Sequence, residues 1–157
     1  MKGITNAVTL AVSDNSIVVL ADGTVRMCGT NSDGVLGDPS PSVAEHLTPF
    51  HVPGATGVRS ARMDRGTTIV QLADGTLRGW GVGYHGALGD GHGDQLSSKP
   101  HAPIGLGTVL AHYLSGNASY AIRPDGTVMV WGIPAAPGGK TEFVLTPIPA
   151  FTVKLSE

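Results

Sequence analysis

The chain has 157 residues, a length that suits one domain with a buried core. Charged residues make up only 14% and apolar residues 41%, with 23 glycines and 11 prolines, which excludes a disordered chain and favours many short β-strands joined by turns. The net charge of −2 gives no global attraction for nucleic acid or anionic lipid, and no apolar run approaches the length of a membrane-spanning helix.

The N-terminal segment leads to an expectation about location. Residues 1–6 contain one basic residue, and the apolar run over residues 7–12 is too short for the core of a signal peptide. The single cysteine, Cys28, excludes an internal disulfide framework and a metal site built from cysteines. We therefore expect one all-β domain over residues 1–157, cytoplasmic, without a cofactor, and binding neither nucleic acid nor membrane.

Three segments of the chain align with one another, and each consists of an apolar run, an Asp-Gly-Thr sequence and a second apolar run. They cover residues 17–29, 69–81 and 119–132, so that the motif recurs about every fifty residues. Because Asp-Gly accepts the positive φ angles of a tight turn, each segment predicts a β-hairpin. The three aspartates are therefore interpreted as turn residues and not as catalytic carboxylates: Asp22, Asp74 and Asp125.

Further strands are predicted on both sides of each hairpin. An apolar run precedes each one, at residues 7–12, 58–64 and 109–114. A glycine-rich loop and then a proline-flanked segment follow, and proline is tolerated on edge strands; the segments are 48–53, 99–104 and 146–149. Four strands per unit make one propeller blade, which divides the chain into repeats at about 6–54, 58–105 and 109–152.

The second repeat is the best preserved. Its hairpin ends in Trp80-Gly81, and a Gly-x-Leu-Gly loop follows at residues 86–89. This pattern resembles the repeat of the regulator of chromosome condensation (RCC1), and the resemblance covers about residues 6–152. Two departures stand at the ends of the array: Cys28 replaces the tryptophan in the first repeat, and residues 133–139 replace the Gly-x-Leu-Gly loop in the third.

The resemblance implies a β-propeller with protein-interaction roles, including guanine-nucleotide exchange on a small GTPase and enzyme inhibition. No loop of this chain matches a functional segment for either activity, and a fold alone does not assign one. RCC1-like rings have about seven blades, and closed propellers generally need four or more. Three blades leave two apolar flanks open, which is unfavourable for a soluble monomer.

We therefore expect a partial propeller of three four-stranded blades that a second chain completes. A second copy would give a six-bladed homodimeric pseudo-ring. A complementary four-bladed fragment would give seven blades, and a third alternative is that the chain is part of a longer product.

The innermost strand of the second repeat is unusually charged and suggests a ligand site. With period-two alternation, Arg62 and Asp64 share one face of this strand, flanked by Arg59 and Arg65. By alignment, His112 takes the place of Arg62 in the third repeat. Arg62, Asp64 and His112 are therefore candidates for binding an anionic or polar ligand at the channel mouth. The alternative is that Arg62 and Asp64 pair with each other or contact channel water.

The loop after the second hairpin holds the densest polar cluster. Tyr84 and His85 are candidate ligand-binding residues at its start. Four side chains of metal-ligating type follow one another within it: His85, Asp90, His92 and Asp94. Because Asp90 recurs as Asp38 in the first repeat, the cluster is interpreted as a solvated loop, and no metal site is expected.

Two functions from different classes remain. The leading hypothesis is a non-enzymatic protein-binding and assembly module that completes its propeller by oligomerisation, with itself or a complementary fragment as partner. The alternative is a small propeller-dimer enzyme in which Arg62, Asp64 and His112, with His85 or His92, perform acid–base chemistry on a small or peptidic substrate.

Overall fold

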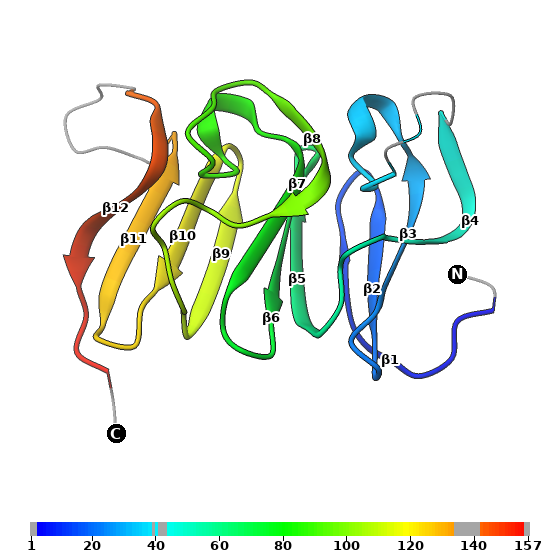
Figure 1. The fold of residues 1–157 in the computed structure, drawn as a ribbon, viewed down its shortest axis with the longest axis horizontal. Helices are drawn as coiled ribbons and strands as arrows, with labels where there is room; N and C mark the ends of the chain where they lie inside the picture. Colours follow the sequence, from blue (N-terminus) through cyan, green and yellow to red (C-terminus); the bar gives the residue numbers. More distant parts are fainter. Residues whose placement is uncertain (1–2, 39, 41–43, 134–141, 156–157) are drawn as a thin grey trace.

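The structure, a computed structural model, describes residues 3–38, 40, 44–133 and 142–155. In this part of the chain twelve β-strands form three four-stranded antiparallel sheets, which stand side by side in chain order (Figure 1). Each sheet consists of four consecutive strands, so each repeat folds as one blade. No helix in the described ranges is long and apolar enough to cross a membrane.

The blades have the same plan, from an inner strand outward to an edge strand. Blade 1 contains β1 (Ala7–Val12), β2 (Ser16–Leu20), β3 (Val25–Thr30), the short 3₁₀ helix η1 (Ser32–Gly34) and β4 (Glu45–His51). Blade 2 contains β5 (Val58–Asp64), β6 (Thr67–Leu72), β7 (Leu77–Val82), η2 (Tyr84–Gly86) and β8 (Leu96–His101). Blade 3 contains β9 (Ala111–Ser115), β10 (Ala118–Ile122), β11 (Thr127–Gly132) and β12 (Val144–Thr152).

The predicted strands are present, with small shifts at their ends. All three Asp-Gly hairpins form, and in each the aspartate carboxylate accepts the backbone N–H of the following threonine. The side chain and the backbone N–H of this threonine both hydrogen-bond to the carboxylate and lower the pKa of the three carboxyls. The proline-flanked segments are the outermost strands, where a missing N–H is tolerated. The third inner strand begins at Ala111, two residues later than predicted.

The hydrophobic core lies between the blades. One cluster joins blades 1 and 2 and includes Ile17 and Met27 from the first blade, and Val70 and Trp80 from the second. A second cluster joins blades 2 and 3 around Trp131. Since burying one large apolar side chain contributes roughly 1.5–3 kcal/mol, these two junctions supply most of the driving force for folding.

The Gly-x-Leu-Gly loops of blades 1 and 2 each receive the tryptophan of the next blade. Trp131 is fully buried and donates its indole N–H to the carbonyl of Ala87, 2.8 Å away. A Cβ at Gly89 would lie only 3.0 Å from that indole, and Gly37 approaches Trp80 in the same way. The sequence therefore keeps glycine in these loops because the ring of the following blade occupies the space of a side chain. The departure of the third loop, at residues 134–139, lies outside the described residues.

Candidate functional site

One face of β5, the charged inner strand of blade 2, is turned toward blade 3. Arg62 pairs in register with Ile69, which belongs to the core between these two blades. Asp64 lies two residues further along the same face and accepts the backbone N–H of Gly116, in the β9–β10 turn, at 2.6 Å. The Arg62 side chain is exposed and donates to the carbonyl of Ala61 at 3.0 Å. Arg62 and Asp64 thus make contacts with the backbone and no ion pair with each other within the described residues.

The register corrects one alignment made from the sequence. His112 pairs with Ala121 as Ala61 pairs with Val70. Ala121 and Val70 each lie four residues before the aspartate of their own hairpin turn. His112 is therefore the counterpart of Ala61, and the counterpart of Arg62 is Tyr113. Alignment by residue type was wrong by one position, and a shift of one turns a side chain to the opposite face of the sheet.

His112 therefore points into the junction of blades 2 and 3. It is 8% exposed, and its Nε2 atom has no hydrogen-bond partner. Burial lowers the pKa of His112 to about 4, the positive charge of Arg62 acts in the same direction, and a hydrogen bond to the Ile69 backbone acts against both. The imidazole is neutral at physiological pH and serves as part of the packed junction.

The polar cluster of the second loop divides into two groups. The carboxylate of Asp94 accepts the backbone N–H of His85 at 2.7 Å and lies 3.5 Å from its ring nitrogen. Asp90 lies 3.7 Å from His92 and 3.2 Å from His101. No group of three metal-ligating side chains with suitable geometry occurs in the described ranges. His101 is the member of this cluster that the sequence analysis did not identify, because it lies on β8, outside the loop.

His85 also packs against an aromatic ring from blade 3. Its ring stacks on Phe143 with centroids 4.6 Å apart, and Tyr84 lies beside it at 6.3 Å. Tyr84 and Phe143 are both exposed, Tyr84 to 42% and Phe143 to 55%. The two predicted ligand residues of the loop thus belong to an exposed aromatic surface over blades 2 and 3.

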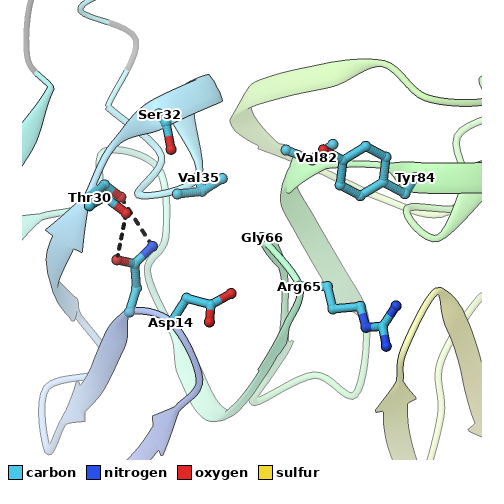
Figure 2. Close-up of a pocket in the computed structure, with 9 residues that line it drawn as sticks. Asp14, Thr30, Ser32, Val35, Arg65, Gly66, Val82 and Tyr84 are labelled. Carbon is cyan, nitrogen blue, oxygen red and sulfur yellow. Dashed lines mark hydrogen bonds between the residues drawn. The ribbon is translucent and has the colours of Figure 1, made fainter.

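Tyr84 also borders a polar pocket between blades 1 and 2, shown in Figure 2. The pocket has a volume of about 310 Å³, and its walls come from two turns and the two strand ends that lead into η1 and η2. The lining residues are Asp14, Asn15, Thr30, Ser32, Val35, Arg65, Gly66, Val82 and Tyr84. Asn15 and Thr30 bond to each other, with the amide nitrogen 3.1 Å from the Thr30 carbonyl.

The junction that holds this pocket lacks hydrogen bonds that are present at the second junction. At the second junction, Asp64 bonds to Gly116, and Ser119 and Trp131 both donate to the Ala87 carbonyl. In blade 1 the residue at the position of Asp64 is Ser13, and the β1–β2 turn is one residue shorter. At the first junction, the Trp80 indole nitrogen and the Thr68 hydroxyl have no partner. The shorter turn was visible in the sequence, but its consequence depends on the neighbouring blade.

Comparisons with known proteins agree with this architecture. No protein-family model matches the sequence. The chain is 27% identical over 133 residues to a secretion-regulating guanine nucleotide exchange factor from Bos taurus. Among solved structures it superposes on human WBSCR16 with a TM-score of 0.77 at 22% identity, covering 95% of this chain. It superposes on Prp20p from Saccharomyces cerevisiae, described as yeast RCC1, with a TM-score of 0.76 at 15% identity, covering 94%.

The chain is built from RCC1-like repeats. The three four-stranded sheets and these similarities confirm the resemblance found in the sequence. The RCC1-like array is short: it spans 27% of the length of the bovine exchange factor and 39% of WBSCR16 and of Prp20p. At these identities the solved structures show the fold of the repeats.

Proposed function

We propose that this RCC1-like array is a non-enzymatic protein-binding module that completes its propeller by pairing with a second copy of itself. The relatives support the binding role: the structure of Prp20p was reported with its binding to Gsp1p and histones, and Prp20 was solved with Kap60 bound to it. The observation that carries the assembly role is the state of the two outer flanks, which expose side chains at positions that are buried inside the array.

The first flank is the outer face of blade 1. Leu10 and Val18 pair at the position that Ala61 and Val70 occupy in blade 2. In blade 2 this pair is buried against blade 1, whereas Leu10 is 64% exposed. A groove of about 340 Å³ runs over this face and is lined by Ile4, Leu10, Val12, Ser16, Ile17 and Val18.

The second flank is the outer face of blade 3. Tyr113 and Tyr120 pair at the position that Arg62 and Ile69 occupy in blade 2. Ile69 is covered by blade 3, whereas Tyr113 and Phe151 are each 61% exposed. The groove on this face has a volume of about 370 Å³, and its lining is aliphatic and aromatic apart from His112, which also borders it.

The two flanks are the two halves of a blade junction, because every internal junction joins the same positions. A second copy supplies both missing halves at once, with blade 1 of each protomer against blade 3 of its partner. The product is a six-bladed ring, within the range of closed propellers. Neither flank carries a charged side chain at its centre, so its burial leaves no charge uncompensated.

The mass of the protein in solution tests this assembly. We expect twice the chain mass of 16.0 kDa by light scattering at micromolar concentration. Leu10→Glu and Tyr113→Glu, one on each flank, are expected to produce monomers, because each places a charge in the apolar junction. Ile104→Glu is the matched control, since Ile104 is more than half exposed as well but lies on the middle blade, and it should leave the dimer intact.

A folded 16.0 kDa monomer in the unsubstituted protein overturns the proposal. A larger complex that forms only with a different chain supports ring completion by a complementary fragment and overturns the homodimer. If the control disrupts assembly as strongly as the flank variants, the contact lies elsewhere on the molecule.

The geometry gives less support to the enzymatic alternative. An acid–base catalyst needs a group that the substrate reaches and whose pKa lies near the working pH. Burial and Arg62 hold the pKa of His112 at about 4, and the carboxylate of Asp64 is occupied by the amide of Gly116. We therefore propose the binding function and keep the cytoplasm as the expected location.

A further inference from the structure

The pocket between blades 1 and 2 is lined by two oppositely charged side chains, Asp14 and Arg65, that do not form an ion pair with each other. In Figure 2 the Asp14 carboxylate points across the gap toward the turn that carries Gly66, whereas Arg65 extends from this turn away from Asp14 and below Tyr84. Neither Asp14 nor Arg65 takes part in an ion pair or a side-chain hydrogen bond with any described residue. Both side chains are exposed and remain available to a ligand.

The remaining walls provide apolar contact and further hydrogen-bonding groups. Val35 and Val82 line the pocket from the two blades, and the hydroxyls of Ser32 and Tyr84 border it. A volume of about 310 Å³ is enough for two side chains of a peptide. The pocket thus offers a negatively charged hydrogen-bond acceptor, Asp14, on one wall and positively charged donors, those of Arg65, on the other. Aliphatic surface lies between them.

Nothing in the repeat itself requires this arrangement. Between blades 2 and 3 the same place is closed, because Asp64 bonds to the amide of Gly116 at 2.6 Å. The residues at those positions in the first junction are Ser13 and Arg65, and no hydrogen bond joins them in the described structure. The fold therefore tolerates a closed junction, and the open one is specific to this pair of blades.

We infer that this pocket binds a peptide segment that carries one basic and one acidic side chain, with the basic group against Asp14 and the acidic group against Arg65. The aliphatic part of the basic side chain packs on Val35 and Val82, as long charged side chains do on apolar surface. The guanidinium of Arg65 suits a carboxylate because it presents paired N–H donors. The inference rests on the proposed protein-binding function and assigns it to a place on the array.

A peptide titration followed by NMR tests the inference. The probes are acetyl-Lys-Gly-Glu-amide and its reverse, acetyl-Glu-Gly-Lys-amide, each compared with analogues in which glutamine replaces either or both charged residues. We expect at least one doubly charged peptide to shift the backbone amide signals of Asp14, Gly66 and Tyr84. Loss of either charge should weaken its binding about two- to fivefold, the range of exposed ion pairs.

Variants then assign each charge. Asp14→Asn should remove the preference for lysine over glutamine, and Arg65→Gln should remove the preference for glutamate over glutamine. The matched control is Arg59→Gln, which removes an exposed arginine of β5, the strand that leads to Arg65, and this arginine does not line the pocket. It should leave both preferences unchanged.

The inference is overturned if neither doubly charged peptide binds more tightly than its single-charge analogues. It is also overturned if the peptide with glutamate alone binds as tightly as the doubly charged one, because that result indicates a site for anions only. The mass measurement stays separate, because neither Asp14 nor Arg65 lines the groove on either flank. A monomeric protein that still distinguishes the peptides contradicts only the ring, and a dimer that does not distinguish them contradicts only this site.

Discussion

Replacing Trp131 with alanine is expected to destabilise the protein by about 3–5 kcal/mol, the cost of removing a fully buried tryptophan. Trp131 fills the loop of blade 2 and donates to the Ala87 carbonyl, so its loss leaves a cavity in the junction that joins blade 3 to the array. Urea denaturation followed by far-ultraviolet circular dichroism measures the change, because the fold is entirely β and loses its signal on unfolding.

Cys28→Ala is the matched control for this substitution. Cys28 stands at the position of the tryptophan in blade 1, but it is partly exposed, and among the described residues no loop of another blade lies over it as the blade 2 loop lies over Trp131. We expect a loss below about 1 kcal/mol. Equal losses for Trp131→Ala and Cys28→Ala would contradict the role of the tryptophan as the element that joins consecutive blades.

Acidification from pH 6.5 to pH 4 is expected to destabilise the protein by roughly 3 kcal/mol through His112 alone. The pKa of His112 is about 4 in the folded chain and returns to its ordinary value of 6.5 on unfolding. Between these two values the unfolded chain binds more protons than the folded chain, so falling pH favours unfolding. The contribution is fully present above pH 6.5 and is lost as the pH falls toward 4.

The pH range in which stability is lost distinguishes the effect of His112 from that of the carboxyls. The amide of Ser40 and then His46 lower the pKa of Asp38, so the stability that Asp38 provides is lost only below its ordinary pKa of 3.8. His112→Leu should therefore flatten the curve of unfolding free energy against pH between 4 and 6.5. His92→Leu removes a histidine with a largely exposed side chain and is the control for the substitution itself.

The same slope in the protein and in His112→Leu would show that other groups determine the acid response. An NMR titration of the His112 ring provides a second readout, with Arg62→Gln expected to raise its pKa because a neighbouring positive charge is removed. A ring that titrates near 6.5 in the folded protein would contradict the burial of this imidazole.

Repetition is the reason that so much of the fold was predictable. Three local features occur in every repeat: the Asp-Gly turn, the alternating pattern of the hairpin strands and the proline-bearing edge strand. Their agreement identified four strands per unit and the RCC1-like repeat. The prediction of His112 as the counterpart of Arg62 failed because a glycine-poor inner strand offers no residue that marks its register.

The candidate site was predictable only in part. Tyr84 was predicted to bind a ligand as a loop residue, and it does border the pocket. The sequence did not predict that Asp14 and Arg65 line the same pocket. Their sequence positions are far apart, and only the packing of blade 1 on blade 2 brings the two turns to opposite walls. His101 was missed for the same reason, since it reaches Asp90 from the next strand.

The sequence by itself determined the unit of this protein: a four-stranded blade, its turns and its number of copies, because these depend on the conformations of neighbouring residues. Only the tertiary structure decided what lies between the units. Whether an aspartate bonds to the next turn, as Asp64 does, or borders a pocket, as Asp14 does, depends on what the neighbouring blade places beside it. The packing of one blade on the next and the length of each turn decide this, and neither is a property of neighbouring residues alone.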